Sequence, residues 1–271
     1  MHSLYQSDRP LVMGILNATP DSFSDGGQFN SLQRATEQAK RMIEAGVDII
    51  DIGGESTRPG AGAVSLQQEL DRVIPLISAI KHFGKPISID TSKAEVMSEA
   101  VAAGATMIND VRALQEPGAL TAAVSAQVPV CLMHMQGQPR TMQQTPHYEQ
   151  VTSDVISFLQ QRIDACCEAG MERTLISVDP GFGFGKSLAH NITLLRELEQ
   201  LKELSLPVLV GMSRKSMIGE ITGKPVEQRL AGSLAAVMIA AAKQANIIRV
   251  HDVAETVDAI KVFHAVFKHL Q

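Results

Sequence analysis

Eight short apolar runs recur along the 271-residue chain, and each of them ends in polar or ionisable residues. The clearest spans residues 47–60, VDIIDIGGESTRPG, where an almost continuous β-branched run stops at Gly53 and Gly54 before Glu55 and Arg58 follow. Such a run is typical of a parallel strand covered on both faces, and glycines let the backbone approach another group closely. The other seven runs begin at Leu11, Pro86, Met107, Pro129, Leu175, Pro207 and Ile247. The chain is therefore predicted to contain eight buried parallel strands.

Apolar residues at helical spacing separate these runs. Residues 35–43 form one such stripe, which ends at Gly46, and residues 194–201 carry four leucines with a similar periodicity. Ser92 followed by Glu95 matches a capping box, which predicts that a helix begins directly after the third strand. Eight strands alternating with eight helices predict an α/β protein with the (β/α)8 TIM-barrel fold.

An open doubly wound sheet is the alternative architecture for such a pattern. Its common nucleotide-binding fingerprints are absent, because the glycines of PGFGFGKS are spaced G-x-G-x-G and Pro180 stands where a Walker loop needs glycine. We therefore favour the barrel, as one domain over residues 1–271 with residues 1–10 as an N-terminal tail that carries no motif.

The overall composition argues against several classes of partner. A net charge of -5 gives no general attraction to nucleic acid or to an anionic membrane. The three cysteines show no CxxC spacing, which fits neither a disulfide framework nor a zinc site. The first ten residues lack the apolar core of a signal peptide, and no run approaches the 18 apolar residues of a membrane span. A cytoplasmic protein is predicted.

In a barrel of parallel strands, all eight carboxyl ends meet at one mouth, where such enzymes place their chemistry. The polar residues expected there comprise carboxylates, amides, cations and histidines: Asp51, Asp90, Asp110, Asp179, Asn17, Asn109, Arg58, Arg214, Lys215, Arg249, His134 and His251.

Some of these residues have a structural explanation as well as a functional one. Asp51 lies inside an apolar run and fits a hydrogen-bonding strut as well as a ligand contact. Asp110 is interpreted as an acceptor for loop amides, and His134 as a packed core histidine. Asp90 and Asp179 end buried strands with nothing nearby in the sequence that demands a charge, so a functional role is favoured for both.

Two classes of charge at one mouth indicate a ligand with two chemically different halves. Carboxylates and amides suit a flat heterocycle rich in N–H donors, because one carboxylate can accept two parallel hydrogen bonds. Arginine, lysine, histidine and serine suit a phosphate group. The residues therefore predict a heterocycle joined to phosphate.

Eight motifs accompany the strand ends and read, in chain order, GILNATPDSFSDGG, DIGGESTRPG, SIDTSK, MINDV, MHMQGQPRTMQ, DPGFGFGK, GMSRKS and RVHDV. Together they resemble the bacterial dihydropteroate synthase family, from about Leu11 to the C-terminus. The resemblance implies a TIM barrel, commonly a homodimer, that joins 4-aminobenzoate to 6-hydroxymethyl-7,8-dihydropterin diphosphate and releases diphosphate. It also implies assistance by Mg²⁺, a place in folate biosynthesis and competition by sulfonamides.

Carried over motif by motif, the resemblance implies three groups of contacts. The pterin is expected to contact Asp90, Asn109, Met133, Asp179, Lys215 and Arg249. The diphosphate is expected to contact Asn17, Arg58, Arg249 and His251, with Asn17 also binding magnesium. The 4-aminobenzoate pocket is expected to comprise Phe23, Thr57, Pro59, Phe184, Lys215 and Ser216. The expected catalytic residues are Asp25, Arg58, Lys215, Arg249 and His251.

The chemistry predicted for this mouth needs no protein nucleophile. Diphosphate leaves readily once its charge is neutralised, so a dissociative substitution supported by electrostatic stabilisation and positioning is expected. Residues 17–29 and 53–62 are predicted to form loops that close over the site. The alternatives are a pterin methyltransferase that serves a corrinoid protein, a non-catalytic pterin-binding barrel and a purely structural barrel.

Overall fold

The computed structural model describes residues 2–18, 27–56, 62, 64–137 and 141–267. Eight strands form one sheet in which every hydrogen-bonded neighbour is parallel. Their bounds are β1 Leu11–Asn17, β2 Ile49–Gly53, β3 Ile87–Asp90, β4 Met107–Asp110, β5 Val130–Met133, β6 Ile176–Asp179, β7 Leu209–Val210 and β8 Ile247–Val250. Each strand coincides with one of the eight apolar runs, so the strand prediction is confirmed.

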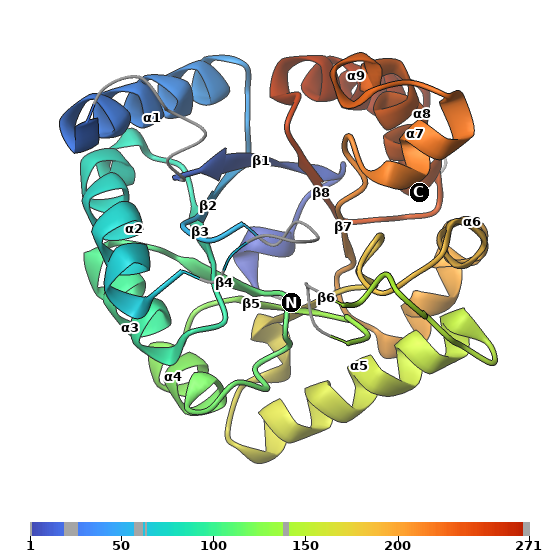
Figure 1. Ribbon diagram of the computed structural model, residues 1–271, viewed down its shortest axis with the longest axis horizontal. Coiled ribbons are helices and arrows are strands. Elements are labelled where there is room, and N and C mark those ends of the chain that lie inside the picture. The colour runs from blue at the N-terminus through green and yellow to red at the C-terminus, as the bar shows by residue number, and fades with distance from the viewer. Residues whose placement is uncertain (1, 19–26, 57–61, 63, 138–140, 268–271) are drawn as a thin grey trace.

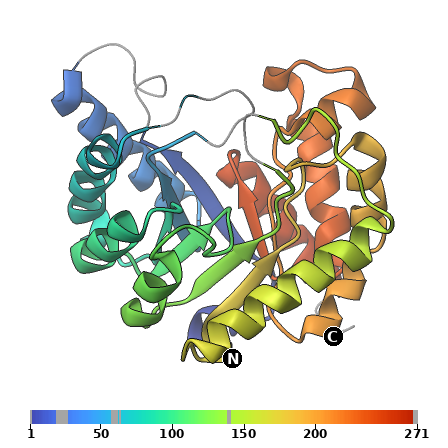
Figure 2. The same ribbon diagram turned by 60° about the horizontal axis from the view of Figure 1, so that its bottom comes forward.

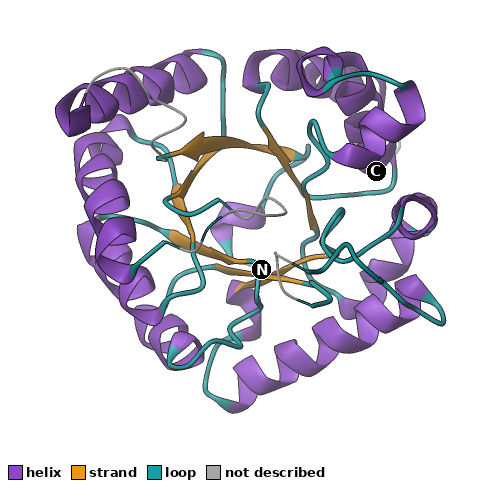
Figure 3. Ribbon diagram, viewed as in Figure 1, coloured by secondary structure: helices purple, strands orange, loops and turns teal. Residues whose placement is uncertain are grey.

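The sheet curls into a barrel, in the order β6-β5-β4-β3-β2-β1-β8-β7. A single parallel bridge between Val178 and Val208 closes the remaining gap, and the Val178 amide donates to the Pro207 carbonyl over 2.9 Å. Viewed along the barrel in Figure 1 and Figure 3, the strands form an inner ring that the helices enclose. The (β/α)8 barrel predicted from the sequence is therefore confirmed.

Nine α-helices lie within the described residues, one more than the eight expected. Their bounds are α1 Gly27–Glu44, α2 Leu66–Ile80, α3 Ala94–Ala103, α4 Ala119–Ala126, α5 Val151–Glu168, α6 Leu188–Arg196, α7 Ser216–Thr222, α8 Leu230–Ala242 and α9 Val253–Phe267. The additional helix is α7, a short helix between β7 and the alanine-rich α8. No helix in this part of the chain has the length and apolarity needed to cross a membrane.

Two local expectations were wrong. The leucines of residues 194–201 do not share one α-helix, because α6 ends at Arg196 and a 3-10 helix, η5 Leu198–Leu204, follows. Ser92 does not cap α3, whose N-cap is Lys93. The Ser92 hydroxyl instead donates to the carboxylate of Asp110, and a hydrogen bond to a carboxylate is stronger than one between neutral groups.

Side chains alternate along each strand between the outside and the inside of the barrel. The outward-facing residues pack against the helices in one large apolar cluster, which includes Val12, Ile50 and Ile248. The inward-facing residues near the amino ends of the strands form a second, smaller cluster, which comprises Met13, Ile49, Met107, Cys131, Leu209 and Ile247 together with Tyr5. The barrel thus has separate inner and outer cores, as expected for strands of period two.

Tyr5 shows that the N-terminal tail is part of the folded barrel. It ends a short 3-10 helix, η1 Ser3–Tyr5, and its ring is only 4 % exposed. Its hydroxyl donates to the Ser177 hydroxyl over 3.2 Å inside the barrel. In Figure 2 the amino end of the chain lies at the bottom of the barrel. The tail therefore closes the end of the barrel at which the strands begin.

Candidate active site

Polar and ionisable side chains follow the inner apolar cluster inside the barrel, two residues further along the strands toward their carboxyl ends. The inward-facing residues there are Asp51 on β2, Asp90 on β3, Asn109 on β4, Met133 on β5, Asp179 on β6 and Arg249 on β8. Strand register pairs Asp90 with Asn109 and Met133 with Asp179. All the residues predicted to contact a pterin from these strand ends therefore face the same interior.

Arg249 is shared by two carboxylates. Its Nε donates to Asp51 over 2.6 Å, and its Nη2 donates to Asp90 over 2.7 Å. Burial raises the pKa of Asp90 to about 7, although Arg249 opposes that rise. Burial alone would lower the pKa of Arg249, but Asp51 and Asp90 more than offset it and raise that pKa. One guanidinium cannot neutralise two buried carboxylates, so this group favours a ligand that donates hydrogen bonds.

Lys215 contacts the turn that follows β6. Its Nζ donates to the Phe182 carbonyl over 2.5 Å and lies 4.6 Å from the centre of the Phe184 ring. Burial lowers the pKa of Lys215 to about 8, although the nearby Asp179 opposes that change. The Asp179 carboxylate in turn accepts from the Gly181 amide over 2.7 Å, and burial raises its pKa. A cation, an aromatic ring and a carboxylate therefore meet at this turn.

Two glycines show how closely these groups approach one another. A Cβ on Gly53 would lie 3.7 Å from Asn17 Oδ1 and 3.8 Å from Asp90 Oδ2. A Cβ on Gly211 would lie 3.8 Å from Arg249 Cβ and 3.9 Å from Lys215 Nζ. Asn17 and Asp90 are therefore the strand neighbours of one glycine, and Arg249 and Lys215 both lie close to the other.

His251 follows β8 and is held by the loop after β7. Its backbone amide donates to the Ser213 hydroxyl over 3.2 Å, and its Nδ1 lies 3.1 Å from the same oxygen. Arg214 donates through Nε to Asp252 over 3.0 Å, which joins the two loops a second time. Ser216 is exposed and begins α7 directly after Lys215. The loops after β7 and β8 thus present their polar residues together.

Five predicted site residues lie outside the described part of the chain: Phe23, Asp25, Thr57, Arg58 and Pro59. The predicted closure of the loops that carry them therefore stays a prediction.

The described ends of the second of these loops are tied together by charge. The Glu55 carboxylate accepts from the Val64 amide over 3.3 Å and from Lys93 over 2.5 Å. Lys93 also donates over 2.5 Å to Glu69, which is buried on α2.

Two residues of the predicted mouth have structural roles, as expected. Asp110 accepts from the amides of Arg112 and Leu114, which confirms its interpretation as an acceptor for loop amides. His134 is buried against the ring of Phe158, with 5.0 Å between ring centres, which confirms its interpretation as a packed histidine. Burial also lowers the pKa of His134 to about 2, so its imidazole is neutral.

Sequence reasoning missed two groups, one at the mouth and one directly behind it. One is the backbone carbonyl of Phe182, which cannot be singled out from the sequence because every residue has one. The other is Lys186, a buried lysine that contacts His134. The closely spaced glycines of GFGFGK were the available signal, because Gly181, Gly183 and Gly185 all adopt positive φ and so indicate a tight, specific turn.

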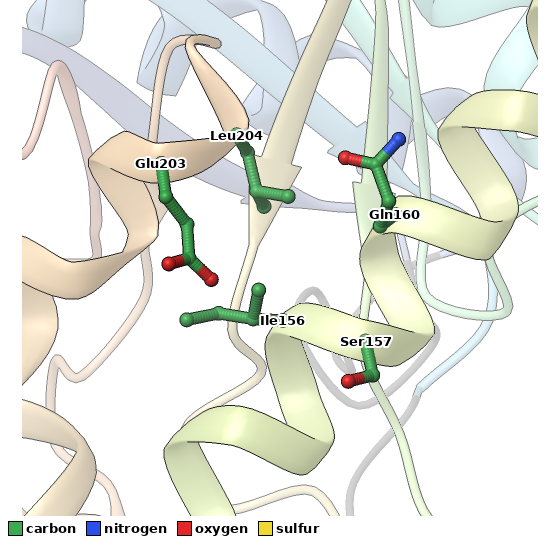
Figure 4. A pocket seen from close by; sticks show the side chains of 5 residues that line it. All are labelled: Ile156, Ser157, Gln160, Glu203 and Leu204. Atoms are coloured by element: carbon green, nitrogen blue, oxygen red, sulfur yellow. The ribbon is translucent and has the colours of Figure 1, made fainter.

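A separate pocket lies between α5 and η5 on the outside of the barrel (Figure 4). It is lined by Ile156, Ser157, Gln160, Glu203 and Leu204. None of the predicted site residues contributes to it.

The donor atoms at the described part of the mouth do not form a cage for a metal ion. Within the described ranges, no three His, Cys, Asp or Glu side chains are grouped so that they could hold one. Asn17 offers one amide oxygen close to Asp90. Such a donor set suits Mg²⁺, which keeps several water ligands and is commonly held by one or two protein oxygens together with substrate phosphates.

Comparison with known proteins gives a consistent result over almost the whole chain. Residues 13–251 match the family described as pterin binding enzymes. A dihydropteroate synthase of Haemophilus influenzae is 56% identical over 257 residues, which cover 94% of each chain.

Solved structures are similar to the same extent. A Yersinia pestis dihydropteroate synthase, solved as a sulfonamide drug complex, gives a TM-score of 0.91 at 55% identity and covers 96% of this chain and 94% of that one. The Xanthomonas albilineans dihydropteroate synthase with 4-aminobenzoic acid gives 0.90 at 54% identity, covering 96% and 93% of the two chains. The same enzyme with 7,8-dihydropteroate gives 0.88 at 50% identity, covering 98% and 95%.

Proposed function

The chain belongs to the pterin binding enzymes and, within them, to the dihydropteroate synthases, and from this premise we propose how its barrel mouth performs the reaction. The substrates are 6-hydroxymethyl-7,8-dihydropterin diphosphate and 4-aminobenzoate, and the products are 7,8-dihydropteroate and diphosphate. The observation that carries the proposal is the convergence of Asp90, Asp179, Lys215 and Arg249 at the carboxyl end of the barrel.

The pterin ring binds between the strand ends of β3, β4 and β6. Asp179 and Asn109 recognise its N–H donors and ring nitrogens, because a carboxylate accepts two parallel N–H bonds and an amide both donates and accepts. Asp90, which Arg249 does not fully neutralise, accepts from the other edge of the ring. Met133, 4 % exposed on β5, packs against one face of the ring and Arg249 against the other.

The diphosphate binds where the loops after β1, β2 and β8 meet. Arg249 and His251 supply positive charge and N–H donors from one side, and Arg58 from the other. The Ser213 contact keeps His251 in place for this role. Asn17 also provides the protein oxygen for Mg²⁺, which neutralises the diphosphate and so makes it a better leaving group.

The 4-aminobenzoate binds over the turn after β6. Phe184 offers an aromatic face, Lys215 lies on that ring, and Ser216 follows at the start of α7. Phe23, Thr57 and Pro59 complete the pocket, and Asp25 covers it when the first loop closes. Sulfonamides compete at this position, since they resemble the aminobenzoate in shape and charge.

The protein acts by positioning and by stabilising charge. When the bond to diphosphate breaks, cations hold the leaving group, while Asp90 and Asp179 hold the pterin ring, over which the positive charge of the methylene group is delocalised. The amine of 4-aminobenzoate then attacks the methylene carbon from its fixed place over the turn. The substitution is therefore dissociative, and no side chain forms a covalent intermediate.

Two further features of the protein are proposed with this function. Large apolar side chains remain exposed on three consecutive helices, namely Ile221 on α7, Ile239 on α8 and Val262 and Val266 on α9, and they support a homodimer. A cytoplasmic location is supported by all three cysteines being free, two of them buried. Light scattering at several protein concentrations tests the first, and fractionation of the native cells tests the second.

The reaction is tested by mixing the purified protein with Mg²⁺ and both substrates and following diphosphate and dihydropteroate together. Equal amounts of both products are expected. Lys215→Ala should abolish their formation, whereas Lys261→Ala, which changes an exposed lysine on α9, should not affect it. Binding of the pterin without either product would exclude the synthase reaction and favour a pterin methyltransferase or a binding protein.

A further inference from the structure

A second lysine lies behind the candidate site and belongs to none of the three groups of contacts. Lys186 is 2 % exposed. Its Nζ donates to the carbonyls of Gly181 and Phe184, over 2.9 and 3.2 Å, and lies 2.9 Å from His134 Nδ1. These three acceptors match the three N–H groups of an ammonium. A buried cation is unfavourable unless its donors are satisfied, so the surrounding atoms are arranged for this side chain.

The atoms that surround Lys186 belong to the turn after β6, residues 181–185. Every carbonyl of this turn accepts a hydrogen bond from a side chain: Gly181 and Phe184 from Lys186, Phe182 from Lys215, Gly183 from Gln143 and Gly185 from Tyr148. Lys186 supplies two of the five donors. One backbone hydrogen bond, from the Phe184 amide to the Gly181 carbonyl over 3.1 Å, lies within the turn. The turn therefore depends on side chains for its shape, and on Lys186 more than on any other side chain.

The turn has no freedom to compensate by packing. A Cβ on Gly181 would lie 1.9 Å from the His134 carbonyl oxygen, and one on Gly185 would lie 2.3 Å from that of Gln136. The chain therefore lies directly against the segment after β5, with glycine at both contact points. A shift of the turn would move it away from that segment rather than into a different packed arrangement.

The opposite side of the same turn faces the candidate site. The Gly181 amide donates to Asp179, the Phe182 carbonyl accepts from Lys215, and the Phe184 ring lies under the Lys215 ammonium. These groups place a pterin carboxylate and the aminobenzoate pocket. The atoms that Lys186 holds are thus one peptide away from the atoms that position both predicted substrates.

We propose that Lys186 is a positioning residue, which fixes the turn 181–185 and through it the Asp179 carboxylate and the Lys215 ammonium. It touches neither substrate. The inference rests on the proposed function, because it concerns the pterin and aminobenzoate halves of that site. The diphosphate half is represented by Asn17 and His251, which are carried by β1 and by the loop after β8 rather than by the turn, and it serves as an internal reference.

The test compares Lys186→Met with the wild type on separate half-ligands. Titration calorimetry with 6-hydroxymethylpterin should show an affinity lowered about tenfold or more, since the Phe184 carbonyl loses its donor and the Gly181 carbonyl keeps only the Phe184 amide. Titration with inorganic diphosphate and Mg²⁺ should show an affinity that changes less than about twofold, the level expected for distant, independent sites. The KM for 4-aminobenzoate should rise more than kcat falls. Equal losses for pterin and diphosphate, or no loss for either, would overturn the proposal.

A second variant keeps the test decisive if Lys186→Met does not fold. Tyr148→Phe removes only the bond to the Gly185 carbonyl and should weaken pterin binding in the same direction, but less, with diphosphate binding again unchanged. No change in pterin binding would then overturn the proposal. Failure of the wild type itself to bind 6-hydroxymethylpterin would contradict the proposed function instead, so the two failures are distinguishable.

Discussion

The two ends of the barrel interior are built from the same strands but carry opposite chemistry. On β2, the inward-facing Ile49 lies nearer the amino end of the barrel and Asp51, two residues later, nearer the carboxyl end. On β8, Ile247 and Arg249 are related in the same way. One pleat separates an apolar layer, closed by Tyr5, from a layer of buried charges.

This difference means that each strand contributes to stability at its amino end and to ligand binding at its carboxyl end. At the amino end, each buried side chain contributes apolar burial without any unpaired charge. At the carboxyl end, burial raises the pKa of Asp90 and Asp179 and lowers that of Lys215, which means that their charged forms are less stable there than in water. The mouth therefore gives up stability to hold charges ready for ligands. Mutations at the two ends should have separable effects.

The largest effect is expected at the amino end. Tyr5→Ala should lower the free energy of unfolding by about 3 to 5 kcal/mol, because it empties the space of a buried aromatic ring beneath the barrel. Urea denaturation measures the change. Calorimetry should show pterin affinity unchanged in the folded variant. A clear loss of pterin affinity would mean that the two ends are coupled and that the comparison is wrong.

The converse is expected for Asp179→Asn at the carboxyl end. The amide still accepts from the Gly181 amide but cannot accept two bonds from a pterin, so affinity should fall by about 10- to 150-fold. The free energy of unfolding should stay level or rise, since burial already disfavours this carboxylate. Asp258→Asn, an exposed change on α9, is the matched control. Normal pterin affinity in Asp179→Asn would contradict the pterin assignment.

The sequence was sufficient to predict the carboxyl end of the barrel but not the amino end. Each strand is marked in the sequence by its own apolar run, which ends in polar residues. The spacing of apolar residues and the point where each run ends therefore locate Asp90, Asp179 and Arg249 without any information about tertiary contacts. Tyr5 lies in a tail with no motif, and its partner Ser177 is 172 residues away. Nothing local encodes that contact.

Other misses have the same physical origin. Lys186 ends PGFGFGK, which matches no nucleotide-binding motif, and two of its three partners are backbone carbonyls, which every residue possesses. Ser92 matches a capping box, yet its hydroxyl is bonded to a carboxylate on the next strand. In each case a tertiary contact decided the outcome.

Not every buried charge on the carboxyl side of the barrel is held for a ligand, and Glu69 on α2 is expected to support the fold. The buried Glu69 contacts only Lys93 among the donors in the described chain. Lys93→Met should therefore lower the free energy of unfolding by about 1 to 3 kcal/mol, because it leaves a buried carboxylate unpaired. Adding Glu69→Gln should recover part of the loss, since it removes the unpaired charge. A double variant no more stable than Lys93→Met would show that the pair does not support the fold.

The smallest expected effects are opposite responses of the two ends to alkaline pH. Burial raises the pKa of Tyr5 above its ordinary value of 10.0, so above pH 10 the unfolded chain loses a proton that the folded chain keeps. The wild type should then lose stability with pH relative to Tyr5→Phe, by at most about 1.4 kcal/mol per pH unit. Below pH 10 the wild type should be more stable by a constant 0.5 to 1.5 kcal/mol or so, from the bond to Ser177.

Lys215 should respond in the other sense. Its pKa is about 8 in the folded chain and 10.5 ordinarily, so between these values the folded state has released a proton that the unfolded state still binds. The free energy of unfolding contributed by this group therefore rises with pH between these values. Across that range the free energy of unfolding of the wild type should increase relative to that of Lys215→Met. Urea denaturation of the wild type and both variants from pH 7 to 11 gives the two difference curves. Opposite slopes are expected although burial disfavours the charged form of both side chains, because tyrosine becomes charged by losing a proton and lysine by binding one. A level or falling curve for Lys215 would show that burial does not destabilise its ammonium in the folded mouth.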